Sequence, residues 1–153
     1  MLRSATYVTV VAALVAVFAV LTLRHRLPIG PVVLGLSLLP LLGLFLIRRS
    51  IVGAVPDLVF GTIDTGLLTI SALWGGVTFG IAGAIAGGVV GDAITDAIAG
   101  FFEGGIAEWL RTRGIEESRE AVTTSLGKMC GCLLGSGFVL SVALLAGIKP
   151  EFP

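Results

Sequence analysis

Long apolar stretches, separated by short polar breaks, run through the whole chain. The apolar residues are continuous rather than alternating with polar ones, which is typical of membrane-buried helices and not of β-strands. About 20 apolar residues are needed to cross the hydrocarbon core of a bilayer. The breaks leave stretches at residues 5–23, 32–47, 55–77, 80–110 and 129–148. The pattern therefore predicts an all-α bundle of about five membrane-spanning helices, forming a single transmembrane domain over residues 1–153.

Two of these stretches leave alternatives open. Residues 80–110 are too long for one crossing, since about thirty residues at ~1.5 Å each reach about 45 Å against a core of ~30 Å. We expect this helix to extend into the cytoplasm, or to break near Gly104 and Gly105. A four-span arrangement, with residues 92–110 on the membrane surface, is the alternative. We expect residues 5–23 to be a retained helix, whereas a signal peptide led by Arg3 is the other interpretation.

The composition agrees with an integral membrane protein. Of the 153 residues, 56% are hydrophobic and only 13% are charged, whereas soluble domains carry about a quarter charged residues. The formal net charge is zero, so no nucleic-acid partner is implied. The sequence contains no P-loop, nucleophile elbow or paired-histidine motif, so it supports no enzymatic function and requires no cofactor.

The basic residues predict how the bundle is oriented. Five spans with a cytoplasmic N-terminus place seven basic residues inside and three outside, which the positive-inside rule favours. The seven are Arg3, Arg48, Arg49, Arg111, Arg113, Arg119 and Lys128, and the three are Arg24, Arg26 and Lys149. The polar segment 111–128 then becomes a cytoplasmic loop.

Glycines recur at four-residue spacing in the middle of the chain. They are Gly76 and Gly80, followed by Gly83, Gly87 and Gly91. Small residues at this spacing allow the backbones of membrane helices to approach closely. One interpretation is internal packing of the third helix on the fourth, and the other is a seam between the subunits of a homo-oligomer.

Four carboxylates lie within these apolar stretches, where charge is costly: Asp64, Asp92, Asp96 and Glu103. On a helix the last three fall within a sector of about 40° and form an oxygen-rich stripe. Such ligands suit divalent cations such as magnesium, calcium, manganese and ferrous iron, and crowded carboxylates are consistent with proton coupling. Two other interpretations stay open: the stripe faces water, and Asp64 is a protonated acid hydrogen-bonded to another helix.

Residues 59–71, with the sequence VFGTIDTGLLTIS, resemble the first helix of the vacuolar iron transporter family. That helix carries a glycine–x–x–Asp-Gly-Leu-Val-Thr/Ser-Thr pattern, into which Thr65 is inserted here. Residues 95–100, TDAIAG, resemble the Ser-Met-Ala-x-Gly segment of the family's next helix. The resemblance covers roughly residues 55–120, and the two leading spans are an addition.

This resemblance implies a dimer that exports divalent metal from the cytoplasm in exchange for protons. Asp64 takes the place of the family's first-helix aspartate, which is expected to bind the transported ion. Asp96 stands where the family has methionine, a departure that makes the site harder. Asp92 is the residue available to replace the family's acidic ligand earlier in that helix.

The sequence therefore favours a homo-oligomeric membrane transporter of divalent cations, with the metal ion as substrate. Asp64, Asp92 and Asp96 are predicted to line the path, with Glu103 at its cytoplasmic mouth. The alternative is a non-transporting membrane assembly protein, in which the glycines pack subunits and the 111–128 loop docks a partner.

Overall fold

The computed structural model describes residues 2–115 and 120–148. These residues form helices and no strand, so the all-α prediction is confirmed. The elements are α1 (Leu2–Arg24), α2 (Ile29–Leu36), α3 (Leu38–Leu46), the short 3-10 helix η1 (Val52–Ala54), α4 (Val55–Thr112) and α5 (Ala121–Leu145).

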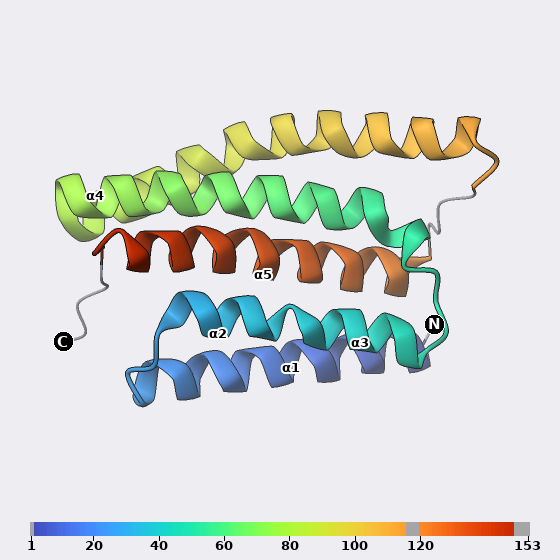
Figure 1. Ribbon diagram of the computed structural model, residues 1–153, viewed down its shortest axis with the longest axis horizontal. Coiled ribbons are helices and arrows are strands. Elements are labelled where there is room, and N and C mark those ends of the chain that lie inside the picture. Colours follow the sequence, from blue (N-terminus) through green and yellow to red (C-terminus); the bar gives the residue numbers. More distant parts are fainter. Residues whose placement is uncertain (1, 116–119, 149–153) are drawn as a thin grey trace.

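Helix α4 is a hairpin and not a straight rod (Figure 1). Gly80 interrupts it with φ 66° and ψ −151°, a backbone conformation that is essentially restricted to glycine. A first arm (residues 55–79) and a second arm (residues 81–112) therefore lie side by side and run in opposite directions. The chain reverses at this glycine without a polar loop, at the boundary between the predicted spans 55–77 and 80–110.

Replacing Gly80 with alanine should destabilise the bundle by about 1–3 kcal/mol, the typical cost of holding an L-residue in this conformation. A methyl group at residue 80 meets open space, so the cost comes from the backbone alone. Unfolding by sodium dodecyl sulfate in mixed micelles measures it. Gly88→Ala is the control, because that glycine also faces open space but has helical dihedral angles. Equal losses of stability in the two variants would contradict the explanation.

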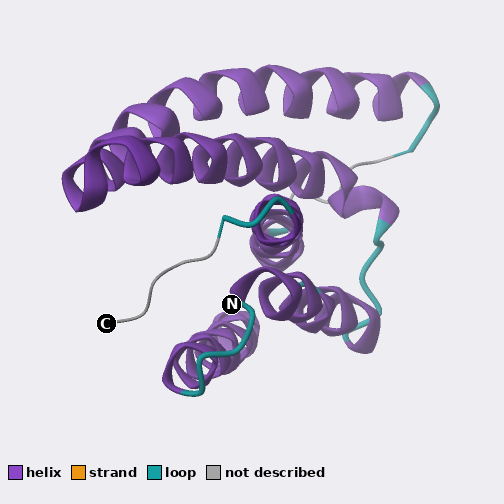
Figure 2. Ribbon diagram, turned by 60° about the vertical axis from the view of Figure 1, so that its left-hand side comes forward, coloured by secondary structure: helices purple, strands orange, loops and turns teal. Residues whose placement is uncertain are grey.

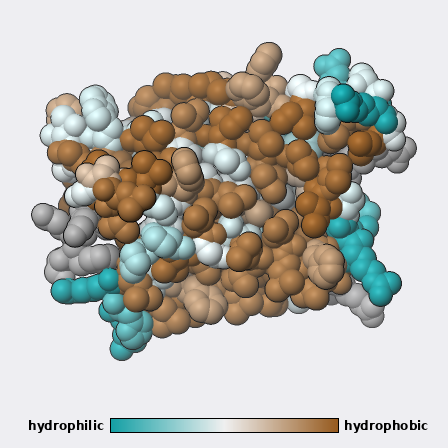
Figure 3. Space-filling view, in the orientation of Figure 1, coloured by the Kyte–Doolittle hydropathy of each residue, from teal (hydrophilic) through white to brown (hydrophobic). Residues whose placement is uncertain are grey.

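Four helices are long and apolar enough to cross a membrane: Ala5–Arg24, Ile29–Leu46, Val52–Thr112 and Ala121–Leu145. The third of these is folded at Gly80, so the four helices supply five rods to the bundle (Figure 1). Figure 3 shows an apolar surface around the middle of the molecule, with hydrophilic atoms gathered towards its ends. The helices and this apolar surface are those expected of a membrane protein.

Two helix boundaries differ from the sequence prediction. The second span breaks at Ser37, whose hydroxyl donates to the Leu34 carbonyl oxygen at 2.6 Å. Pro40 does not cause this break, because it lies in the first turn of α3, where a missing N–H is tolerated. Helix α5 begins at Ala121 and not near residue 129. Its first turns look polar in sequence but bury Val122 and Leu126 against the core formed with α1, α3 and η1.

Helix α5 joins the two halves of the molecule. Within the described residues, α4 contacts α5 and η1 but none of α1, α2 and α3, whereas α5 contacts all of these elements. Figure 2 shows the helix that leads to the C-terminus lying between the α4 hairpin and the N-terminal helices. Gly131 and Gly135 bring its backbone against the first arm of α4, and Gly137 brings it against α2. The close approach on both faces explains why this helix carries so many glycines.

Candidate functional site

Asp64 is buried at the contact between the two arms of α4, with 8% of its surface exposed. Thr95 of the second arm, 3% exposed, donates its hydroxyl to Asp64 Oδ1 at 2.5 Å. The neighbouring Thr65 hydroxyl lies 3.5 Å from Asp64 Oδ2. The carboxylate is therefore held by a hydroxyl from the opposite arm, which is the kind of partner that one interpretation of the sequence required.

Asp92 and Asp96 lie on the exposed side of the second arm. The inward positions of that arm are Gly91, Thr95 and Ala99, which are buried and spaced by four. Residues that follow these positions by one are turned by about 100° around the helix. The two aspartates therefore lie off the face that packs against the first arm, and a single chain does not bring them together with Asp64.

Glu103 is paired with a base that the sequence analysis did not connect with it. Lys128 Nζ lies 3.5 Å from Glu103 Oε2, and the glutamate side chain is 16% exposed. The same ammonium lies 4.0 Å from the centre of the Phe60 ring. The sequence predicts that Lys128 lies in a loop. In the structure it belongs to α5 and contacts both arms of α4.

The four predicted metal ligands are not gathered into one group among the described residues. Among residues 2–115 and 120–148, no group of three or more His, Cys, Asp or Glu side chains is arranged to hold a metal ion. The cause is the orientation of the second arm. Its glycines pack against the first arm, and Asp92 and Asp96 lie off that contact.

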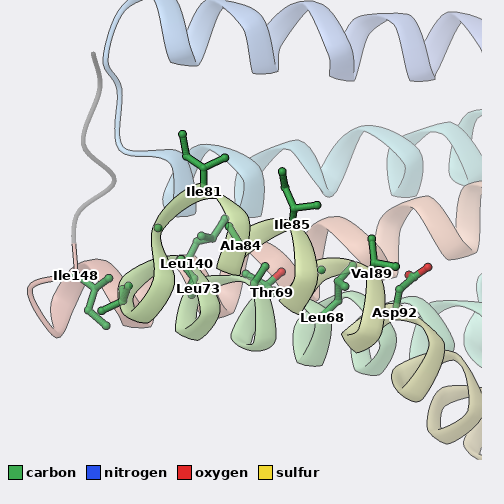
Figure 4. Close-up of a pocket in the computed structure, with 15 residues that line it drawn as sticks. Leu68, Thr69, Leu73, Ile81, Ala84, Ile85, Val89, Asp92, Leu140 and Ile148 are labelled. Carbon is green, nitrogen blue, oxygen red and sulfur yellow. The ribbon is translucent and has the colours of Figure 1, made fainter.

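A groove of about 1250 Å³ opens between the two arms of α4 and the end of α5 (Figure 4). It follows the hairpin from the turn at Gly80 to Leu68 on the first arm and Asp92 on the second. Its other lining residues are Thr69, Ala72, Leu73, Gly76, Val77, Ile81, Ala84, Ile85, Gly88, Val89, Leu140 and Ile148. Asp92 is the one charged side chain among them. The inner end of the groove lies one helical turn from Asp64 on the first arm and about one turn from Thr95 on the second.

Three of the five predicted packing glycines close the hairpin. A methyl group at Gly83 would collide with the Gly75 carbonyl oxygen, and one at Gly87 with the Ser71 carbonyl oxygen. A methyl group at Gly91 would lie 2.9 Å from Ser71 Cβ. Gly76 makes only an ordinary contact and Gly80 forms the turn. These glycines therefore pack the third span on the fourth, as the first interpretation of their spacing proposed.

A second set of close contacts, between α4 and α5, was not predicted from the sequence. Methyl groups at Gly61, Gly131 and Gly135 would all collide with the backbone of the facing helix. The signal was present, since Gly127, Gly131 and Gly135 repeat at the same four-residue spacing as the glycines of the hairpin. It lay partly within the segment that was predicted to be a loop.

No protein-family model, no curated protein and no solved structure matches this chain. The resemblance of residues 59–71 and 95–100 to vacuolar iron transporters therefore stays a prediction.

Proposed function

We propose that the protein carries cations across a membrane, with Asp64 as the carboxylate on which the cation and a counter-transported proton alternate. The observation that carries this proposal is the position of Asp64. It is buried inside the bundle, hydrogen-bonded to Thr95, and one helical turn beyond the inner end of an open groove. A carboxylate inside a membrane bundle is costly, and in membrane proteins such groups mark ion and proton paths.

The surroundings of Asp64 supply the two sides of a path. On the side of the Gly80 turn, the groove reaches Leu68 and Asp92, so a cation can approach with part of its hydration shell. On the other side, the ion pair between Glu103 and Lys128 crosses from the second arm to α5. Glu103 lies about 12 Å along the second arm from Thr95 at ~1.5 Å per residue. In this proposal the pair closes the path on that side and must separate for the ion to pass.

Divalent metal ions are the proposed cargo, with water completing their coordination. Such ions prefer six or more oxygen ligands, and Mg²⁺ usually keeps several waters. Asp64 and Thr95 supply protein oxygens at one point of the path, and Asp92 attracts cations at the inner end of the groove. Asp96 lines neither the groove nor the contact with Asp64, so we assign it no part in the path.

We propose the orientation that the basic residues favour. The start of α1 lies at the same end of the bundle as the connection 47–54 and the end of α4 (Figure 1), where the chain carries Arg48, Arg49 and Arg113. This end is the cytoplasmic one under the positive-inside rule. The mouth of the groove at Gly80 then opens to the opposite side of the membrane.

An assembly protein is supported less well by the geometry. In that reading the glycines at residues 76–91 pack one subunit on another. Three of them already make contacts inside the hairpin. The assembly hypothesis therefore lacks the free glycines with which one subunit would pack on another.

Flux into proteoliposomes tests the proposal. Purified protein is reconstituted, and uptake of Fe²⁺, Mn²⁺, Co²⁺ and Mg²⁺ is measured together with proton movement. Asp64→Asn should lower the flux by about tenfold or more, equivalent to ~1.4 kcal/mol or more in the barrier, because the amide cannot take up a cation or exchange a proton.

Asp96→Asn is the matched control for this experiment. It removes a carboxylate from the same hairpin but outside the path, so its flux should stay close to that of the wild type. Circular dichroism and gel filtration verify that each variant is folded. Wild-type flux in Asp64→Asn, or no flux of any cation with folded and inserted wild-type protein, would show that the proposal is wrong.

A further inference from the structure

Asp92 lies at the inner end of a groove whose walls are otherwise almost entirely apolar (Figure 4). Of the lining residues, only Asp92 is charged and only Thr69 carries a hydroxyl. The walls come from leucine, isoleucine, valine and alanine side chains and from glycine backbone, on both arms and at the end of α5. The volume of about 1250 Å³ exceeds the ~300–1,000 Å³ typical of pockets for drug-sized molecules. An organic molecule of that size therefore fits.

The Asp92 carboxylate has no cationic partner among the residues that the structure describes. The ion pairs found there join Lys128 to Glu103 and Arg49 to Glu120. The nearby Thr95 hydroxyl donates to Asp64. Asp92 lies about 18 Å along the second arm from Gly80 at ~1.5 Å per residue, well inside a hydrocarbon core of ~30 Å. A carboxylate at that depth is expensive unless a cation neutralises it.

The lining of the groove decides which cation suits it. A small inorganic ion needs several oxygen ligands to stay bound, and Asp92 belongs to no three-ligand group in the described residues, so such an ion passes Asp92 without resting there. A small hydrophilic amine loses its hydration and gains little from the walls. An organic cation with apolar substituents places its charge near Asp92 and removes its apolar surface from water against residues such as Ile81 and Ile85.

We propose that this groove binds a lipophilic organic cation, such as a quaternary ammonium or phosphonium compound, with its charge at Asp92 and its apolar groups along the groove towards Gly80. This site shares the groove through which the proposed transport path approaches Asp64, but the binding rests on Asp92 and does not depend on transport. Acyl chains of the bilayer are the competing occupant of the apolar walls, but they bring no charge to Asp92.

The test is equilibrium binding to the full-length protein in phosphatidylcholine nanodiscs. The probe is radiolabelled tetraphenylphosphonium, and the neutral comparison is triphenylphosphine oxide. We expect saturable binding of the phosphonium, with the neutral compound at least about tenfold weaker, equivalent to ~1.4 kcal/mol. Empty nanodiscs measure partition of each probe into the lipid.

Variants locate the site. Asp92→Asn should weaken phosphonium binding by about tenfold or more, while Asp92→Glu keeps the charge and should retain most of it. Asp96→Asn is the matched control, because Asp96 lies one turn farther along the same arm and does not line the groove. Gly88→Leu projects into open space within the groove and should weaken binding while leaving every carboxylate in place.

Several outcomes would overturn the proposal. Equal binding of the charged and neutral probes would show that the groove holds only apolar molecules such as acyl chains. Equal losses of phosphonium affinity in Asp92→Asn and Asp96→Asn would show a general effect of surface charge. Absence of saturable binding to folded wild-type protein would show that no such site exists. If Asp92→Asn fails to fold, Gly88→Leu and the neutral probe still test whether the groove binds the cation. Asp64→Asn should bind normally, which separates this result from that of the flux experiment.

Discussion

Replacing Gly131 with alanine should destabilise the protein by about 3 kcal/mol, the upper end of the usual range for overpacking. A methyl group at this position collides with the carbonyl oxygen of Leu58 and lies 2.9 Å from the amide nitrogen of Thr62. Both are backbone atoms inside a helix and cannot rotate away. Relief requires α4 and α5 to move apart, which weakens the contacts along the whole interface that holds the hairpin to the rest of the bundle.

Titration with sodium dodecyl sulfate in mixed micelles, followed by circular dichroism, measures this loss of stability. Gly104→Ala is the matched control, since Gly104 lies within α4 and a methyl group there meets open space. Alanine is the better helix former by up to ~1 kcal/mol, so the control should be neutral or slightly more stable. If both variants lose stability equally, close approach of the backbones does not explain the glycine.

Replacing Lys128 with methionine should cost about 2 kcal/mol, within the range for leaving a buried polar or charged group without its partner. Methionine keeps most of the length and apolar contact of the lysine stem but removes the ammonium that lies 3.5 Å from Glu103 and above the Phe60 ring. Glu103, with 16% of its side chain exposed, is then left in a partly buried position without the ammonium that offsets its charge.

A double-mutant cycle with Glu103→Gln isolates the pair. Because the second substitution removes the unpaired charge, the double variant should be more stable than Lys128→Met alone. Arg49→Met is the comparison for an exposed pair: Arg49 and Glu120 lie 2.6 Å apart with side chains 40% and 51% exposed. Exposed pairs contribute ~0–1 kcal/mol, so Arg49→Met should lower the stability only slightly. Additive effects of Lys128→Met and Glu103→Gln would mean that the pair does not stabilise the fold.

The fold was largely predictable, because apolar runs of membrane length determine where helices form. The glycines near residue 80 also indicated where the chain reverses. What the pattern could not reveal was the start of α5, since Thr123 and Thr124 read as polar surface. Thr123 is fully buried, like its neighbours Val122 and Leu126. The buried face of the helix therefore includes a polar residue. Such burial depends on neighbours from α1, α3 and η1 that are distant in sequence.

The candidate site was predictable only in part. The apolar surroundings of Asp64 marked it as an unusual acid, and the structure places it inside the hairpin. The acidic stripe and the glycine ladder, however, occupy different faces of the same arm. Gly91 and Asp92 are neighbours and lie about 100° apart around the helix, so the arm cannot turn both towards the first arm. Close packing through Gly87 and Gly91 determines the rotation of the arm, so Asp92 lies at the edge of the open groove and Asp96 lies outside it.

The bridging position of α5 has a consequence for biosynthesis. Four of the five rods precede α5 in the chain, and the α4 hairpin makes no described contact with α1, α2 or α3. While the ribosome is still completing residues 121–145, the hairpin and the N-terminal helices therefore lack the helix whose native contacts join them. Tertiary assembly has to wait for the last helix to insert. The two glycine-lined faces of α5 then join units that were already in the membrane.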